Sequence, residues 1–561
     1  MGPLWHALFG LAATFVARRA LEQQWVTDLA PDAWVAAALR VGVPTAIALG
    51  TMLAIGAGLL GRDTWRSFRD DAISAFASFV ALFVLAVGPL SRDAMGVLVV
   101  AIVAMRIGPW AYWAARRGAP PAYIFALAFC FYAPLAGWRV AASLPFGDQV
   151  FYLLSAERLA HFDFDATIDP QRFFEILGVE PNGIDQLTHI VHAPAGARLV
   201  QGYALPAVLA PGAAAGGEVG ATLVIALFAA WASLETWRLL GDTAPHPSGR
   251  IAWALVTFCA PLALAAVHIY PNAVGAAFVA SGYRYAFTAR HARPLIAGVL
   301  LGATALLNPR DGFVLALLAP FALLLPGRLR FFAGAAASVI VAALVSLVTF
   351  GLPVPYAGYL FATSAIGLVQ SEPTWTFRFW IGLPAILFDR VFGIAGTAPW
   401  MLISAIGSVP ALRRDRRLLP GAVAVVASVF LLSLFGLWEG GYAPPNRYVV
   451  DVLPLVAPFV AFGLASARGV VLRTLCGILI AMSALSTALL LAIPSAALNT
   501  AFEDKPRALV ARAIGLDPLA WLPSFQPLTP DWSIAAYTRL VPLVIAVALL
   551  AWFGARRSAR T

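Results

Sequence analysis

The chain has 561 residues, of which 61% are hydrophobic and only 12% are charged, and its formal net charge is +10. A soluble globular protein of this length cannot bury so much apolar surface, so the composition predicts that a lipid bilayer surrounds most of the chain. The positive charge does not indicate nucleic-acid binding, because the arginines lie in short loops between apolar segments.

Apolar segments long enough to cross a bilayer recur along the whole chain. A helix needs roughly 20 apolar residues to span the hydrocarbon core, and this length predicts an all-α polytopic membrane protein with about 13–16 transmembrane helices. The candidate spans start near residues 3, 35, 71, 95, 121, 216, 250, 272, 293, 312, 331, 395, 419, 448, 470 and 536.

The predicted spans and the longer polar stretches divide the chain into five regions. These are N-terminal transmembrane helices in 1–138, a first long extracytoplasmic loop in 139–215, central transmembrane helices in 216–351, an extracytoplasmic or interfacial loop in 352–394, and C-terminal transmembrane helices in 395–561 with a further loop at 494–535. We expect amphipathic helices within the extracytoplasmic loops, because their polar and aromatic residues suit the membrane surface.

Arginine-rich loops recur on one side of the predicted membrane. Counting spans places these arginines together: Arg62, Arg66, Arg69, Arg116, Arg117, Arg284, Arg290, Arg293, Arg328, Arg330, Arg413, Arg414, Arg416, Arg417, Arg556 and Arg557. Because basic loops remain in the cytoplasm, this pattern predicts cytoplasmic termini and places the long polar loops on the opposite face. The Arg- and Ala-rich composition favours a bacterial inner membrane as the location.

The first long polar segment, residues 145–200, opens on the sequence Gly-Asp-Gln-Val-Phe-Tyr-Leu-Leu. Its pattern predicts an amphipathic helix from Gln149 to His161 at the membrane boundary, with Tyr152 on the face that points outward. The same outward face is predicted to carry Gln149, Ser155 and Glu157. Asp148 precedes this helix, where an acid either caps the first turn or acts as a general base toward an acceptor hydroxyl.

Two arginines enter predicted spans at the outer face. Arg310 lies in the sequence Asn-Pro-Arg-Asp, where it either holds a phosphate or pairs with Asp311 to order the turn. Arg447 follows a Gly- and Pro-rich loop that starts at Glu439, and it has no acid beside it in the sequence. It either binds a phosphate or extends toward lipid headgroups.

Other polar residues on this face can contact a substrate. His192 either lines a cleft or is a solvated loop residue, and Tyr270-Pro271-Asn272 either adds polar contacts or only breaks a helix. No ligand spacing typical of a metal site is present. The acids that follow His161 leave a divalent cation open as an alternative.

Several of these segments resemble one known family. The sequence from Gly147 to Leu154 looks like the start of the first external loop in the GT-C superfamily of integral-membrane glycosyltransferases, and His192 to Pro206 is similar to the end of that loop in bacterial members of the dolichyl-phosphate-mannose–protein mannosyltransferase type. Tyr270 to Asn272, Asn308 to Arg310 and Gly440 to Tyr448 resemble further landmarks, so that the resemblance covers roughly residues 140–465.

The chain departs from the family pattern at three places. Gln149 stands where a partner acid is common beside the loop aspartate, and Asn272 stands where an acid is common after Tyr-Pro. More spans precede the loop than in the family, which leaves residues 1–120 without an assigned role.

The resemblance implies a GT-C-like fold and an enzyme, a glycosyltransferase that moves a hexosyl or pentosyl group from a polyprenyl-phosphate donor to an acceptor hydroxyl on the extracytoplasmic face. Carried over residue by residue, Asp148 is the catalytic base, and Arg310 and Arg447 contact the donor phosphate. We expect the following residues to complete the substrate site: Tyr152, His192, Tyr270, Asn272 and Glu439.

The expected partners are the lipid-linked sugar donor, membrane lipid, and an acceptor that is a lipid, a glycan or a protein. No nucleic acid and no cofactor are expected, with the divalent cation left open. The alternative function is a transporter, flippase or polymerase for lipid-linked glycans, which typically has charged residues in mid-span along a transport path. Polar residues gather here on one face, and this favours the enzyme.

Overall fold

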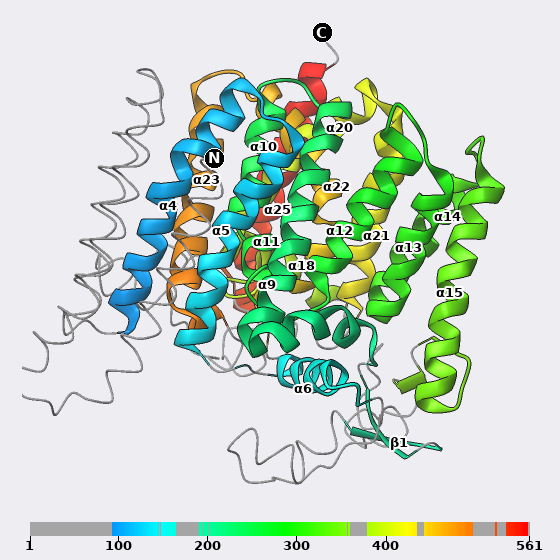
Figure 1. The fold of residues 1–561 in the computed structure, drawn as a ribbon. Helices are drawn as coiled ribbons and strands as arrows, with labels where there is room; N and C mark the ends of the chain where they lie inside the picture. The colour runs from blue at the N-terminus through cyan, green and yellow to red at the C-terminus, as the bar shows by residue number, and fades with distance from the viewer. Residues whose placement is uncertain are drawn as a thin grey trace, which may run out of the picture.

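The computed structural model describes residues 92–163 except 144 and 146, 190–358 except 195, 201 and 356, 379–434, 443–497, 522–523, 525 and 534–558. These residues form a bundle of helices that lie side by side between an upper and a lower end in Figure 1, and one small β-hairpin lies at the lower end. The predicted spans near residues 3, 35 and 71 lie outside the described residues.

The helices and strands, in chain order, are α4 (Arg92–Arg117), α5 (Pro121–Ala142), α6 (Asp148–Ala160), β1 (Ile190–Ala193), β2 (Gly196–Leu199), α9 (Ala204–Thr243), α10 (Ser248–Phe258), α11 (Leu262–Ala265), α12 (Asn272–Tyr283), η2 (Arg284–Thr288), α13 (Pro294–Leu307), α14 (Pro309–Ala322), α15 (Arg328–Phe350), α18 (Phe379–Phe388), α19 (Ile394–Thr397), η3 (Pro399–Leu402), α20 (Ile403–Arg414), η4 (Arg416–Leu418), α21 (Leu419–Ser433), η5 (Arg447–Val452), α22 (Leu453–Ser466), α23 (Val470–Ala492), η6 (Pro494–Ala497) and α25 (Ile534–Ser558).

Within the described part of the chain, eight helices are long and apolar enough to cross a membrane, and shorter apolar helices accompany them. The eight are Ala94–Arg116, Pro121–Ala142, Ala204–Thr243, Ser248–Ala265, Arg328–Phe350, Arg416–Ser433, Arg447–Ser466 and Val470–Ala492. The structure therefore supports an all-α polytopic membrane protein. The total of 13–16 spans and the GT-C-like arrangement stay predictions.

The helix α9 begins at Ala204 rather than near residue 216, and it is broken where the span was predicted to start. Gly217 has a φ of 55°, a left-handed backbone conformation that glycine adopts without strain. The two halves of α9 then approach so closely that Gly212 and Gly220 leave no room for a side chain at either position. The first half thus lies at the lower end of the bundle, and the second half is the membrane-crossing part (Figure 1).

The predicted amphipathic helix is α6, which lies across the lower end of the bundle and packs on α9 (Figure 1). Its predicted orientation is wrong. Gln149, Tyr152 and Ser155 do not point outward but are buried, at 0%, 2% and 3% exposure. A polar side chain at a membrane protein's interior can hydrogen-bond to another helix, so polarity alone did not identify the exposed face.

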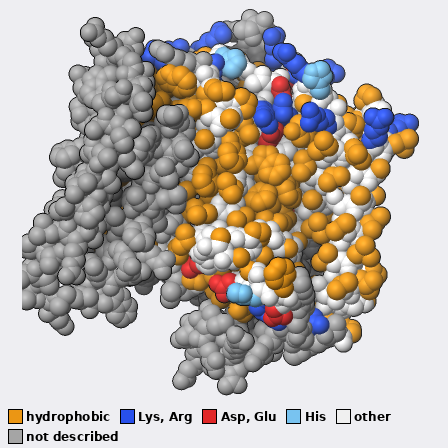
Figure 2. Space-filling view, in the orientation of Figure 1, with side chains coloured by type: hydrophobic (Ala, Val, Ile, Leu, Met, Phe, Trp, Pro, Cys, Tyr) orange, Lys and Arg blue, Asp and Glu red, His pale blue; other side chains and the backbone are white. Residues whose placement is uncertain are grey.

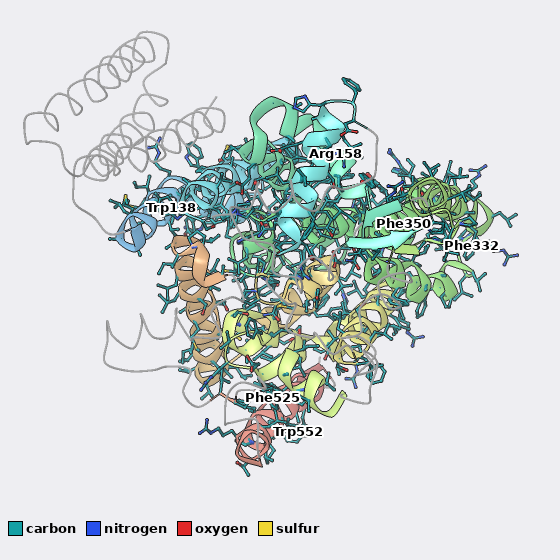
Figure 3. The ribbon with its side chains drawn as sticks, turned by 90° about the horizontal axis from the view of Figure 1, so that it is seen from below. Trp138, Arg158, Phe332, Phe350, Phe525 and Trp552 are labelled. Carbon is teal, nitrogen blue, oxygen red and sulfur yellow. The ribbon has the colours of Figure 1, made fainter. Side chains whose placement is uncertain are left out.

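The hairpin of β1 and β2 lies at the same end as α6. Ile190 pairs with Leu199 and His192 with Ala197 in an antiparallel register. Phe350 at the end of α15 packs against it, as Figure 3 shows from below, and the Arg198 guanidinium donates to the Thr349 carbonyl oxygen at 3.0 Å. The hairpin is therefore fixed to the end of a candidate membrane span.

The opposite end of the bundle carries a network of basic side chains. Arg250 donates to the Arg116 carbonyl oxygen at 2.7 Å, Arg284 lies 2.8 Å from Asp242, and Arg417 donates to the Thr288 carbonyl oxygen at 3.2 Å. Figure 2 shows basic side chains gathered at this upper end, above a broad hydrophobic band. The end that faces the cytoplasm stays a prediction from the positive-inside rule.

A buried carboxylate joins α18 to the chain before α25. Asp389, which has no exposed surface, accepts hydrogen bonds from the backbone N–H groups of Val391, Phe392 and Phe525 at 2.8, 2.9 and 2.8 Å. Burial raises the pKa of the Asp389 carboxyl group, and the three donors act in the opposite direction. This contact holds Phe525 against α18, close to α25 in Figure 3.

Candidate functional site

Asp148, the first residue of α6, faces Arg447, the first residue of η5, across 299 residues of sequence. The Arg447 Nη1 atom lies 3.3 Å from the Asp148 Oδ2 atom, and the two side chains are 11% and 25% exposed. The N-cap residue of α6 is Gly147, and Asp148 is the first residue inside the helix, so Asp148 does not occupy the N-cap position. A negatively charged and a positively charged side chain thus meet at the lower end of the bundle.

Two aromatic rings hold the Arg447 guanidinium. Its central carbon lies 4.7 Å from the centre of the Tyr270 ring and 4.8 Å from that of Tyr448, and its Nη2 atom donates to the Tyr448 hydroxyl at 3.1 Å. Arginine stacks on aromatic faces through its planar, delocalised charge. The orientation of the guanidinium is therefore fixed by groups other than the acid that it faces.

The turn before Arg447 explains how the chain places it there. Asn446 has a φ of 58°, in the left-handed region that asparagine tolerates better than most residues. Its side-chain amide donates to the Thr397 hydroxyl, and the Arg447 N–H donates to the Pro444 carbonyl oxygen at 3.2 Å. Pro444 and Pro445 precede this turn and restrict its backbone.

The Tyr270 ring is presented by the buried segment between α11 and α12. The Gln149 Oε1 atom accepts from the Ile269 N–H at 3.1 Å, and the Arg139 Nε atom donates to the Val267 carbonyl oxygen at 2.9 Å. Because Gln149 and Asp148 are neighbours on α6, one turn of that helix holds both the Tyr270 segment and the arginine stacked on it.

His268 in this segment is fully buried, and its Nδ1 atom makes a 2.8 Å hydrogen bond to the Leu264 carbonyl oxygen. Burial, together with the nearby charge of Arg139, lowers the pKa of His268 to about 3. The imidazole is therefore neutral near neutral pH and donates from Nδ1. A buried neutral histidine of this kind supports the segment without adding charge to the site.

A second polar cluster lies behind Tyr270, at the start of α12. The Asn272 side-chain amide donates to the Asp451 Oδ2 atom at 2.9 Å. Carboxylate oxygens of Asp451 and Asp311 both approach the α-carbon of Gly275, where a side chain would meet them. The site residues predicted from the sequence do not include Asp451 or Asp311. Each of these acids lies just inside a predicted apolar span, and a charged residue at such a position is itself an indication of a functional site.

The structure brings together part of the predicted substrate set. Tyr270 contacts Arg447 directly, and Asn272 is held by Asp451. Tyr152 is buried in the apolar core. His192 lies in β1 and Arg310 in the first turn of α14, but their side chains are not described, and Glu439 lies outside the described residues. Their predicted roles stay predictions.

A small open pocket, with a cavity volume of about 50 Å³, lies beside the hairpin. It is lined mainly by apolar side chains at the ends of α13 and α15 and at the start of α9, among them Leu307, Val345 and Phe350. Leu307 directly precedes the Asn308-Pro309-Arg310 sequence. The pocket is mainly apolar and lies at the same end of the bundle as Asp148 (Figure 1).

Among the side chains that the structure describes, no group of three or more His, Cys, Asp or Glu residues lies together as a metal site. Asp163, one of the acids considered as cation ligands, is exposed and pairs with Arg158 at 2.7 Å, and Asp165 is outside the described residues. Metal dependence stays open.

Comparison of the chain with protein-family models, with curated proteins and with solved structures gave no match. Its function is therefore inferred from the residues and geometry of the site.

Gln149→Met is expected to destabilise the fold by about 1–3 kcal/mol, because the buried Ile269 N–H then loses its acceptor. The measurement is the thermal unfolding midpoint of the purified protein in lipid nanodiscs. Arg158→Met on the same helix serves as the control, since it removes the exposed pair with Asp163 and should change the midpoint little. Equal midpoints for Gln149→Met and wild type would show that Gln149 does not hold the segment.

Proposed function

We propose that the chain is a membrane glycosyltransferase that moves a sugar from a polyprenyl-phosphate donor to an acceptor hydroxyl, with its site at the α6 end of the bundle. The observation that carries the proposal is the meeting of Asp148 with Arg447, 3.3 Å apart, at one end of a set of membrane-length helices. A lipid-borne donor reaches a site at this boundary without leaving the bilayer.

Asp148 supplies the base. In the proposed step its carboxylate takes the proton of the acceptor hydroxyl while the hydroxyl oxygen bonds to the anomeric carbon of the donor sugar. The bond from that carbon to the phosphate oxygen breaks, and the polyprenyl phosphate leaves with the electron pair. The 25% exposure of Asp148 supports this role, because the carboxylate is accessible while the rest of its turn is buried.

Arg447 supplies the positive charge for the leaving group. The phosphate gains negative charge as its bond to the sugar breaks, so a fixed cation stabilises the transition state more than the bound donor. The stacking of the guanidinium between Tyr270 and Tyr448 supports this role, because a held cation needs little reorganisation during the reaction.

The prenyl chain and the sugar require further contacts. The apolar pocket beside the hairpin is a candidate for part of the chain, and Arg310 follows one of its lining residues by three positions. We keep His192, Tyr270, Asn272 and Glu439 in the proposed substrate set. A GT-C-like fold, an extracytoplasmic site, cytoplasmic termini and a bacterial inner membrane belong to the same proposal, supported by the basic network at the opposite end (Figure 2).

The test is a transfer assay on purified protein in lipid vesicles, with polyprenyl-phosphate hexoses and pentoses labelled in the sugar. Lipid, glycan and peptide acceptors are offered in turn, and the released polyprenyl phosphate is measured. Release that requires both the wild-type protein and an acceptor supports the enzyme. If no donor reacts but the labelled lipid-linked sugar crosses the bilayer, the chain is instead a carrier of lipid-linked glycans.

Arg447→Lys is expected to raise the KM for the donor about tenfold. Lysine keeps the positive charge, but it cannot stack as a plane on the tyrosine rings or make bidentate hydrogen bonds to the phosphate. Donor concentration series in the same vesicles measure this change. Arg158→Lys, on the exposed pair with Asp163, is the matched control and should leave the KM unchanged. An unchanged donor KM in Arg447→Lys would remove the phosphate contact from Arg447.

A further inference from the structure

The pair of Arg447 with Asp148 is a loose one. A guanidinium has five N–H donors and binds a carboxylate most strongly through two parallel hydrogen bonds. Here the contact with Asp148 is a single one of 3.3 Å, through Nη1, and Nη2 bonds to the neutral Tyr448 hydroxyl. The buried Nε atom of Arg447 has no hydrogen-bond partner among the described residues. Much of the donor capacity of Arg447 is therefore unused.

The rings of Tyr270 and Tyr448 hold the guanidinium independently of the acid. Arg447 can thus exchange one anion for another without losing its position. Asp148 is the first residue of its helix and is the more exposed member of the pair, so its side chain can turn away while Gln149 keeps the helix attached to Ile269.

We propose that the donor phosphate and Asp148 compete for Arg447, so that binding of the donor releases Asp148 to act as the base. This inference rests on the proposed function. A phosphate offers several oxygens to the unused N–H donors of Arg447 and can accept bidentate hydrogen bonds from the guanidinium, whereas Asp148 makes a single contact. A carboxylate paired with an arginine is a weaker base than a released one, because the cation favours its ionised form.

The competition imposes an order on the reaction. Before the donor binds, Asp148 is held by Arg447 and is poorly placed to take a proton from a hydroxyl. After the donor binds, Arg447 contacts the phosphate, and Asp148 is released from Arg447 and lies beside the anomeric carbon. The acceptor hydroxyl therefore loses its proton only when a donor sugar is bound and ready to react with it.

The experiment compares the binding of geranylgeranyl phosphate and geranylgeraniol, two probes that differ only in the phosphate, to the protein in phosphatidylcholine nanodiscs. The measured quantity is the ratio of the two dissociation constants. In Asp148→Asn this preference for the phosphate is expected to rise about five- to tenfold over wild type, because the competing charge is gone. Asp148→Ser is a second neutral variant with the same expectation, and in Arg447→Gln the preference should disappear.

Asp163→Asn is the control, since it removes one negative charge from the same end of the molecule without touching Arg447. If wild type prefers the phosphate but Asp148→Asn and Asp148→Ser show no higher preference, the competition is overturned and the proposed function stands. If wild type does not distinguish the phosphate from the alcohol, the phosphate contact itself is absent, and the proposed function fails together with the competition.

Discussion

Asp148→Asn is expected to lower the turnover of sugar transfer by about 10²–10⁴-fold, the contribution that a positioned general base makes. Asparagine has nearly the same shape but cannot accept the hydroxyl proton. The measurement is kcat in the vesicle assay, with folding checked by the thermal midpoint. Asp163→Asn, an acid of the same end that pairs with Arg158, should retain wild-type turnover.

The same variant separates chemistry from binding. If Asp148 competes with the donor phosphate for Arg447, Asp148→Asn lowers kcat and also lowers the KM for the donor, since the neutral side chain no longer opposes the phosphate. A residue that only supports the fold would not combine slower turnover with tighter donor binding. Turnover equal to wild type in a folded Asp148→Asn protein would remove Asp148 from the reaction.

Much of the helical framework follows from the sequence. Spans predicted near residues 121, 419 and 470 correspond to the candidate spans Pro121–Ala142, Arg416–Ser433 and Val470–Ala492. The reason is physical, because a backbone in hydrocarbon must satisfy its own hydrogen bonds and the apolar length of a helix must match the bilayer. At the span predicted near residue 272, the structure has the 12-residue helix α12, which is too short to cross a membrane alone. The start of α9 was misplaced because its first half is also apolar and helical, and only the Gly216–Gly217 break separates it from the span.

The contact between Asp148 and Arg447 was harder to predict than the interest of either residue alone. The position of Asp148 after an apolar span drew attention to this residue, but its partner Arg447 comes from 299 residues away. Arg447 has no acid beside it in the sequence, and the structure provides one through tertiary packing. Long-range pairing leaves no local pattern, so the sequence suggested both residues without joining them.

The orientation of α6 shows a second limit. A water-soluble amphipathic helix turns its polar face to solvent, and the same rule applied to α6 placed Gln149 and Ser155 outside. Both are buried against the protein, and Gln149 accepts the Ile269 N–H there. At a membrane boundary the protein interior is often the more polar neighbour, so hydrophobicity alone does not determine which face is buried.

Arg139→Met is expected to destabilise the fold by about 3–5 kcal/mol, the range for removing one partner of a buried ion pair. Arg139 is 1% exposed, and its Nη1 atom lies 2.5 Å from the Glu218 carboxylate just beyond the break in α9. It also donates to Thr222 at 3.2 Å and to the Val267 carbonyl oxygen at 2.9 Å. The measurement is the denaturation midpoint in lipid bicelles, converted to a free energy of unfolding.

The double variant Arg139→Met with Glu218→Met distinguishes a lost pair from a stranded charge. Most of the expected loss comes from leaving the Glu218 carboxylate without its cation in a low-dielectric setting, so removing both charges should recover a large part of the stability. Arg158→Met, which breaks an exposed pair on α6, should change stability by less than about 1 kcal/mol. If the double variant were no more stable than Arg139→Met, the hydrogen bonds to Thr222 and Val267 would be the dominant contribution. Because the Val267 contact holds the segment that carries Tyr270, Arg139→Met should then also weaken donor binding through Arg447.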